Sequence, residues 1–259
     1  ELPAEITSLR AGDLDGDGTA ESVGGCADGT VAALSASGEE RWRVGLGAKV
    51  NDIAVADLDG DGSAEVLCGV EDSRLEVLGG DGAARWTRRF EAYRSEGGID
   101  GHVRVVTVAD FDGEGAPEIA VGCANTFFYV LDNRGEVLGG DRPWEINWRH
   151  KACAIAAADV TGDGVLELLG GWTYATQWIV DFTKTGGRRR SAVPSSLSGA
   201  SAIAAADVSG DGRADALFAG ADGTLTACTV APPGEQSAQI YWQETVGDDR
   251  LAALVARDL

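Results

Sequence analysis

The sequence predicts an all-β fold: a β-propeller of four-stranded antiparallel blades, with five complete blades and the inner strand of a sixth. Three observations indicate it. An acidic nine-residue segment recurs five times, starting at residues 13, 57, 110, 159 and 207. Short apolar runs flank every copy, and the chain has 37 glycines in 259 residues, as many short strands and turns require. The spacing of the copies matches a propeller blade of about 40–50 residues.

Each repeat contains the same four predicted strands in the same order. Small apolar residues precede the acidic segment, as in residues 53–56, and suit an inner strand that crowds toward a central axis. A second strand follows the segment, a tight turn such as residues 27–29 leads to a third, and in three repeats a glycine-containing turn leads to a fourth. The fourth strand opens with tryptophan, which is most simply explained by packing between blades. These tryptophans are Trp42, Trp86, Trp144 and, more loosely, Trp242.

We expect one propeller domain over residues 1–259. Its predicted blades span residues 5–46, 49–90, 102–148, 151–192 and 200–246. Residues 251–259 match the inner strand of a blade, and Asp258 falls where a sixth acidic segment would begin. Either this extra strand closes the ring, or the parent chain continues into further blades or domains. We expect the second, with six or seven blades in the complete ring.

Each acidic segment is predicted to be a calcium-binding loop. Oxygen-bearing side chains stand at positions 1, 3, 5 and 9, position 7 can offer its backbone carbonyl, and Gly at position 6 permits a positive φ. Calcium accepts about six to eight oxygens in a flexible shell, whereas magnesium requires a tighter octahedron. The predicted ligands are Asp13, Asp15, Asp17, Thr19, Glu21, Asp57, Asp59, Asp61, Ser63, Glu65, Asp110, Asp112, Glu114, Ala116, Glu118, Asp159, Thr161, Asp163, Val165, Glu167, Asp207, Ser209, Asp211, Arg213 and Asp215.

Neither an EF-hand nor a set of plain hairpin turns fits these loops as well. An EF-hand needs an acid at position 12 of its loop, and these segments have none there and are flanked by predicted strands. Hairpin turns would account for one copy, but not for five in register. We expect up to five calcium ions, bound best by the first two loops. Loop 3 has the longer Glu114 at position 5, and loops 4 and 5 have the neutral Thr161 and Ser209 at position 3.

The formal charge of −21 comes in large part from these loops, which hold 18 of the 42 acidic residues at positions 1, 3, 5 and 9. This charge argues against a nucleic-acid partner, which needs a basic surface. No run of 18 apolar residues occurs, which argues against membrane insertion. Without metal, repulsion among the carboxylates should loosen each loop. The five cysteines lack metal-ligand spacing and are expected to be buried small hydrophobes.

With these DxDxDGxx[DE] loops the chain resembles the FG-GAP/VCBS repeat family of calcium-loop propellers, which includes the integrin α-subunit head. The resemblance covers nearly the whole chain. The Phe-Gly and Gly-Ala-Pro strands of that family are absent, so the chain is more similar to its bacterial-style members. Residues 33–42 and 77–86 also resemble the tryptophan-docking repeat of quinoprotein propellers. The resemblance implies a structural role for calcium and a functional surface on the opposite face.

The blade ends opposite the calcium loops are predicted to form a ligand surface across blades 2 to 4, because the repeat is broken there. Blade 2 ends in an insertion over residues 90–99, and blades 3 and 4 have bulky residues where other blades have small ones. Aromatic, arginine, histidine and asparagine side chains suit sugar rings. Alternatively, the aromatics pack under the insertion and the charges are solvated. The expected surface consists of Tyr93, Arg94, His102, Asn125, Trp148, Arg149, His150, Trp172 and Tyr174.

These features favour a non-catalytic module that binds carbohydrate or protein outside the cell, on a secreted or surface-exposed protein, where millimolar calcium suits open loops of this kind. No catalytic residue is predicted, because no nucleophile elbow, HExxH motif or phosphate loop occurs. The alternative functions are the propeller of a polysaccharide lyase or hydrolase and, less favoured, a quinoprotein-like dehydrogenase. The alternative location is that of an intracellular trafficking propeller.

Overall fold

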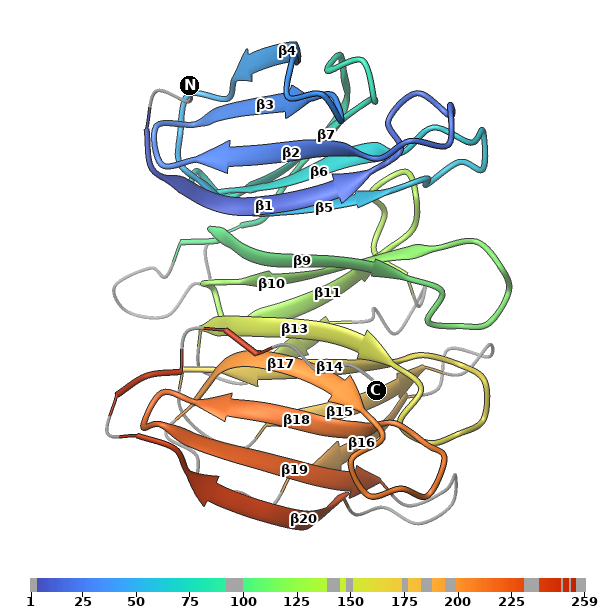
Figure 1. The fold of residues 1–259 in the computed structure, drawn as a ribbon, viewed down its shortest axis with the longest axis vertical. Helices are drawn as coiled ribbons and strands as arrows, with labels where there is room; N and C mark the ends of the chain where they lie inside the picture. The colour runs from blue at the N-terminus through green and yellow to red at the C-terminus, as the bar shows by residue number, and fades with distance from the viewer. Residues whose placement is uncertain are drawn as a thin grey trace. The chain divides into compact units, whose positions relative to one another are not determined.

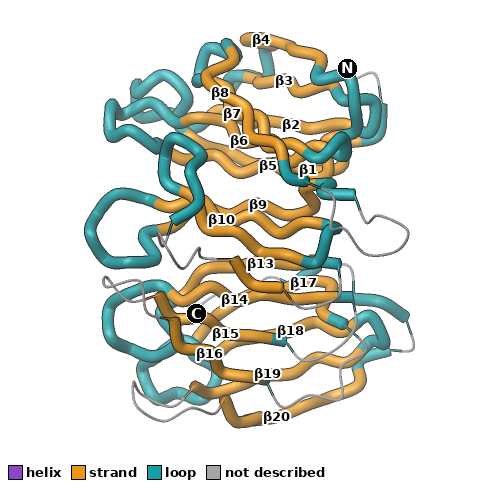
Figure 2. The backbone as a smooth tube through the Cα atoms, turned by 180° about the vertical axis from the view of Figure 1, so that it is seen from behind, coloured by secondary structure: helices purple, strands orange, loops and turns teal. Residues whose placement is uncertain are grey.

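The protein is built from strands joined by loops, and Figure 2 shows no helix among the described residues. The computed structural model describes residues 4–91, 100–138, 145–147, 151–173, 177–182, 188–193, 199–230, 238–247, 249–251 and 253–254. No helix able to cross a membrane is found in this part of the chain. The predicted all-β class is confirmed.

In the part of the chain that the structure describes, twenty strands form five four-stranded sheets, each with its strands in chain order (Figure 1). We call these sheets blades 1 to 5. Blade 1 contains β1 (Ile6–Gly12), β2 (Glu21–Cys26), β3 (Thr30–Leu34) and β4 (Glu40–Gly45). Blade 2 contains β5 (Val50–Ala56), β6 (Glu65–Val70), β7 (Arg74–Leu78) and β8 (Ala84–Arg89). Blade 3 contains β9 (Val103–Ala109), β10 (Glu118–Cys123), β11 (Phe127–Leu131) and β12 (Glu145–Asn147). Blade 4 contains β13 (Ala152–Ala158), β14 (Glu167–Trp172), β15 (Trp178–Phe182) and β16 (Arg188–Ala192). Blade 5 contains β17 (Ala200–Ala206), β18 (Asp215–Gly220), β19 (Thr224–Val230) and β20 (Ala238–Thr245).

The chain divides into two compact units. Unit 1 consists of residues 1–108 and 116–149, and unit 2 consists of residues 109–115 and 150–259. Unit 1 therefore holds blades 1 to 3 apart from the end of β9, and unit 2 holds blades 4 and 5. The prediction of a single domain over the whole chain stays a prediction.

Small residues on the second strand of a blade allow the inner strand of the next blade to approach. A Cβ added to Gly25 of β2 would lie 2.7 Å from a methyl carbon of Val50 on β5, and one added to Gly69 of β6 would lie 2.7 Å from Val103 on β9. In unit 2, Gly171 of β14 has the same relation to Ala200 of β17, also at 2.7 Å. The second strands are almost entirely buried, so this contact forms the centre of the core.

Tryptophans of the fourth strand dock on the next blade, as the sequence predicts. Trp42 of β4 packs against Gly82 in the β7–β8 turn, and its indole N–H donates to the carbonyl of Gly80 at 2.8 Å. Trp86 of β8 packs in the same way against Gly135. Both glycines have positive φ, of 80° and 83°, and because they lack a Cβ the indole ring can pack directly against their backbone. Trp144 lies outside the described residues.

Side chains at the start of the inner strands also link consecutive blades. The hydroxyl of Thr7 donates to the carbonyl of Val50, and the amide of Asn51 donates to the carbonyl of Val103. In unit 2, the hydroxyl of Ser201 donates to the carbonyl of Leu251.

Leu251 therefore takes the position that Val50 and Val103 hold in blades 2 and 3. Of the predicted sixth inner strand, Leu251, Ala253 and Leu254 are described and lie outside any strand. The rest of that strand falls outside the described residues.

Candidate functional site

The first aspartate of each acidic loop organises the loop backbone. In loop 1, the two carboxylate oxygens of Asp13 accept the N–H groups of Gly16 and Gly18, each at 2.8 Å. Asp57, Asp159 and Asp207 do the same in loops 2, 4 and 5. The glycines at positions 4 and 6 have positive φ in these loops, for example 74° and 84° in loop 1. The sequence predicts this conformation for position 6 and misses it for position 4.

Three loops bring their carboxylates together within one unit. In each, oxygens from three acids lie within 4.8 Å of one another. The groups are Asp13, Asp15 and Asp17 in loop 1, Asp57, Asp59 and Asp61 in loop 2, and Asp159, Asp163 and Glu167 in loop 4. Oxygens gathered at this spacing are suited to a hard cation such as calcium or magnesium.

Loops 3 and 5 differ from these three. Loop 3 is divided between the two units; in its first part, the N–H of Glu114 donates to Asp110 at 3.1 Å and to Asp112 at 2.9 Å. Among the described residues, the acids of loop 5 form no such group. There, both N–H groups at positions 2 and 3 donate to one oxygen of Asp215, at 3.0 and 2.8 Å. Glu167 of loop 4 accepts the same two N–H groups on one oxygen, at 2.8 and 3.2 Å, so this contact does not distinguish loop 5.

The glutamate at position 9 is buried in loops 1, 2 and 4. One oxygen of Glu65 accepts the N–H of Leu58 at 3.0 Å, and one oxygen of Glu167 accepts the N–H of Val160 at 2.8 Å. Thr161, the predicted neutral ligand, donates its hydroxyl to the other oxygen of Glu167 at 2.9 Å.

Burial raises the pKa of both Glu65 and Glu167, for Glu167 to about 7, although the hydrogen bonds to its carboxylate act in the opposite direction. Neither glutamate forms an ion pair with a described cationic side chain. A cation in the loop would supply the missing charge.

Arginines already neutralise part of loops 1 and 5. Arg41 of β4 forms ion pairs with Asp15 and, at 2.7 Å, with Glu21. Arg213, at position 7 of loop 5, pairs with Asp211 at 2.7 Å. The Arg41 contacts were not predicted from the sequence. The available signal was the arginine that directly precedes a docking tryptophan and recurs as Arg85. The pairing weakens the expectation that loop 1 is among the best sites.

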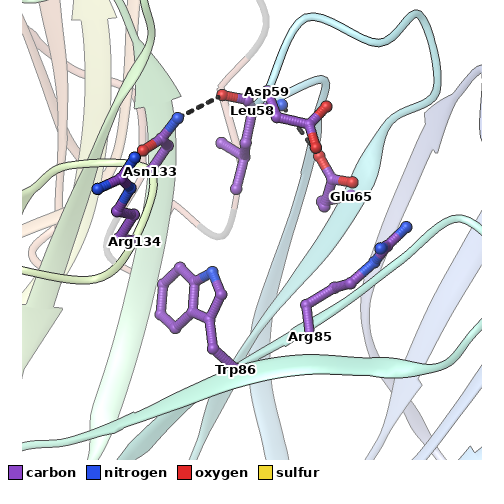
Figure 3. Close-up of a pocket in the computed structure, with 7 residues that line it drawn as sticks. All are labelled: Leu58, Asp59, Glu65, Arg85, Trp86, Asn133 and Arg134. Carbon is purple, nitrogen blue, oxygen red and sulfur yellow. Dashed lines mark hydrogen bonds between the residues drawn. The ribbon is translucent and has the colours of Figure 1, made fainter.

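A pocket lies beside loop 2, within unit 1 (Figure 3). Its volume is about 310 Å³. Loop 2 and the start of β6 form one wall, β8 forms the base, and the turn after β11 forms the opposite wall. The residues that line it are Leu58, Asp59, Glu65, Arg85, Trp86, Asn133 and Arg134.

The ligand surface predicted at the opposite blade ends requires a correction for two residues. Asn125 and Trp172 are each 1% exposed, so neither can contact a ligand. The amide of Asn125 instead donates to the carbonyl of Glu91 at 2.8 Å and to the hydroxyl of Tyr129 at 3.0 Å. Burial accounts for the error, because a polar or aromatic residue that breaks a repeat can be needed inside the blade.

His102 is the other described residue of that predicted surface. It is partly exposed and lies 3.4 Å from Asp100 and 3.8 Å from Glu71. The remaining members lie outside the described residues: Tyr93, Arg94, Trp148, Arg149, His150 and Tyr174.

Comparisons with known proteins support the propeller fold. The family model of the lambda-carrageenase beta-propeller domain matches residues 23–139. No match is found among curated proteins. Among solved structures, BBS1N in complex with ARL6DN has a TM-score of 0.68 at 12% identity, over 94% of this chain and 69% of that one.

Two further solved structures have the same kind of likeness. BamB from Moraxella catarrhalis has a TM-score of 0.59 at 16% identity, over 95% of this chain and 66% of that one. The Cps50 (Swd1) beta-propeller domain of Myceliophteria thermophila has a TM-score of 0.60 at 14% identity, over 95% and 74%. Together with the five four-stranded sheets, these likenesses define the chain as a β-propeller. At such identities they show the fold alone, and the resemblance to FG-GAP/VCBS repeats stays a prediction.

Proposed function

We propose that this chain is a calcium-stabilised propeller of a secreted or cell-surface protein, and that it acts as a non-catalytic module that binds carbohydrate. The observation that carries the calcium part is the gathering of carboxylates in loops 2 and 4. Each loop has a buried glutamate that forms no ion pair with a described cationic side chain. A buried carboxylate without an ion-pair partner is costly, and a divalent ion offsets that cost. The charge of Arg85 offsets part of it for Glu65.

Calcium fits these loops better than magnesium does. The carboxylates come from a glycine-rich turn that also offers backbone carbonyls, and this arrangement suits a large shell of variable geometry. The hydrogen bonds from Gly60 and Gly62 to Asp57 hold the turn in place before an ion enters. Each oxygen of an aspartate can accept a backbone N–H and still offer a lone pair to a cation.

Calorimetric titration of demetallated protein with calcium tests this part. We expect heat of calcium uptake, and a fall in the melting temperature when a chelator is added. Asp57→Asn should remove the uptake assigned to loop 2. Asp28→Asn is the matched control, because Asp28 also accepts a backbone N–H in a turn, that of Thr30 at 2.9 Å, but lies outside the acidic loops. No uptake, or equal uptake by both variants, would refute the calcium proposal.

The carbohydrate part is supported by the match to a propeller domain named for a carbohydrate-active enzyme. A protein ligand remains the alternative, because one structural neighbour was solved in complex with a protein partner, ARL6DN. An extracellular location is part of the same proposal. A glycan array with calcium present tests it, and binding without product release is the expected result.

The second candidate function is the propeller of a polysaccharide lyase or hydrolase. The same family-model match over residues 23–139 favours it. Release of new reducing ends or unsaturated products from a polysaccharide by this chain would establish it over the first. Loss of that release in His150→Ala would then assign the chemistry to the predicted ligand surface.

A further inference from the structure

The pocket beside loop 2 lies at a blade junction where one turn residue differs from that of the equivalent junction. At the junction of blades 1 and 2, a Cβ on Gly80 would lie 1.8 Å from the carbonyl oxygen of Leu14, so the two backbones are in direct contact. At the junction of blades 2 and 3, Asn133 holds the position of Gly80. Its side-chain amide donates a hydrogen bond to the carbonyl of Leu58 at 3.2 Å (Figure 3). The side chain separates the turn from the loop and leaves a space.

Hydrogen-bond donors of the second junction are left free by this change. At the first junction, the indole N–H of Trp42 donates to Gly80 and Arg41 is paired with loop 1. At the second, the indole N–H of Trp86 has no acceptor among the described residues. Arg85 and Arg134 likewise form no hydrogen bond or close ion pair with them, although the charge of Arg85 acts on Glu65. Figure 3 shows these two arginines on opposite sides of the Trp86 ring.

The charge of the pocket depends on the loop that forms one of its walls. Two arginines face two carboxylates, those of Asp59 and Glu65, so the lining is neutral as a whole. Asp59 and Glu65 are also predicted ligands of loop 2. A divalent ion in that loop would neutralise them, leaving two guanidinium groups beside an indole.

We propose that this pocket binds a single anionic sugar residue of a polysaccharide, one that has a sulfate or carboxylate group. Guanidinium groups pair with such oxyanions through two parallel hydrogen bonds. The indole offers an apolar surface and one donor, and Asn133 can accept from a hydroxyl through its carbonyl. The volume, about 310 Å³, lies at the small end of the range of ligand pockets, roughly 300–1,000 Å³, and suits one or two sugar rings. The proposal rests on the proposed function, since it needs the cation in loop 2 for its net positive charge.

Calorimetry on the calcium-loaded chain tests this proposal with three tetrasaccharides: an oligouronate, a sulfated galactan fragment and a neutral galactan fragment. We expect one or both anionic probes to bind at least tenfold more tightly than the neutral one, and their ranking distinguishes carboxylate from sulfate. Arg134→Gln and Arg85→Gln should each weaken that binding at least tenfold. Arg43→Gln removes the same charge from an exposed arginine of β4 that is paired with Glu40, and should leave it unchanged.

A calcium titration of the same sample separates the two proposals. Calcium uptake without anionic sugar binding would overturn the pocket proposal but not the calcium proposal. Sugar binding that both pocket variants retain would do the same. Arginine-dependent sugar binding without calcium uptake would overturn the calcium proposal and show that the arginines bind the anion without a cation in loop 2. Equal binding of the neutral probe would show that the anion is not what the pocket recognises.

Discussion

At the scale of single residues, the acidic loops differ in how their charge is balanced. The loops share one backbone turn, but their buried acids have different neighbours. Glu21 is paired with Arg41, whereas Glu65 and Glu167 have only backbone and hydroxyl donors. The number of acids in a loop therefore does not by itself rank its affinity for a cation.

Removing the arginine from loop 1 should strengthen calcium binding there. The guanidinium of Arg41 occupies carboxylate oxygens of Asp15 and Glu21 that an ion would use, and it repels a divalent cation. We expect Arg41→Gln to raise the affinity of loop 1 by a factor of about 2–5, the range expected for the loss of an exposed ion pair. Calorimetry in an Asp57→Asn, Asp159→Asn background, which silences loops 2 and 4, provides the measurement. An unchanged or lower affinity would mean that Arg41 and the ion do not compete.

Loop 4 should make the ion-free protein sensitive to pH. The pKa of Glu167 in the folded chain, about 7, lies above its ordinary value of 4.5 because the group is buried. The folded state therefore holds its proton more tightly than the unfolded state, and ion-free stability should fall as pH rises from 4.5 through 7. Calcium binding requires the ionised carboxylate, so calcium affinity should rise over the same range. Chemical denaturation of the ion-free protein at pH 5 and pH 8 measures the first effect. Glu167→Gln should reduce the difference in unfolding free energy between the two pH values.

At the scale of strands and turns, a glycine in the second strand sets the distance between blades. Gly69 of β6 meets Val103 of β9, whereas Gly45 at the end of β4 has nothing within 4 Å of where a Cβ would stand. Both glycines lie in strands and neither has a positive φ, so the two positions differ mainly in the space around them.

These two glycines form a matched pair of substitutions. Gly69→Ala should lower the free energy of unfolding by about 2 kcal/mol, because overpacking forces the neighbouring strand to move. Gly45→Ala should change it by less than about 0.5 kcal/mol. If chemical denaturation gives the same loss of unfolding free energy for both substitutions, the close approach of β6 to β9 does not depend on a glycine at position 69.

At the scale of the whole molecule, blades are joined by a few polar contacts as well as by apolar packing. In unit 1, Asp52 of blade 2 accepts the hydroxyl of Ser8 at 2.9 Å, forms an ion pair with Arg10 at 2.9 Å and accepts the N–H of Val106 at 3.1 Å. One carboxylate thus links the inner strands of three blades. Burial raises its pKa, and Arg10 and the hydrogen bonds act against that shift.

Losing this carboxylate should destabilise unit 1 as a whole. Asp52→Ala leaves a buried N–H and hydroxyl without their acceptor, and we expect a loss of about 2–4 kcal/mol. Hydrogen exchange measured on individual proteolytic peptides should show faster exchange in β1, β5 and β9 together. Faster exchange confined to β5 would contradict a link across three blades.

Most of the fold follows from repetition, and most of the corrections come from contacts between repeats. The loop positions, the strand order and the docking of Trp42 and Trp86 all recur, so the sequence predicts them. The burial of Asn125 and Trp172 depends on what surrounds them in space, which a break in a repeat does not reveal. The pairing of Arg41 with Asp15 joins residues 26 positions apart, and its one sequence signal is the arginine that recurs before a docking tryptophan.

The exchange of Gly80 for Asn133 between two equivalent turns has a consequence for how such a chain diversifies. The sheets on either side keep their hydrogen bonds whether the turn has glycine or asparagine, so the change is confined to the blade junction. New recognition sites can then arise by changing one blade junction at a time, while the neighbouring junctions keep their packing. A repeat architecture of this kind separates the residues that maintain its shape from those free to acquire new chemistry.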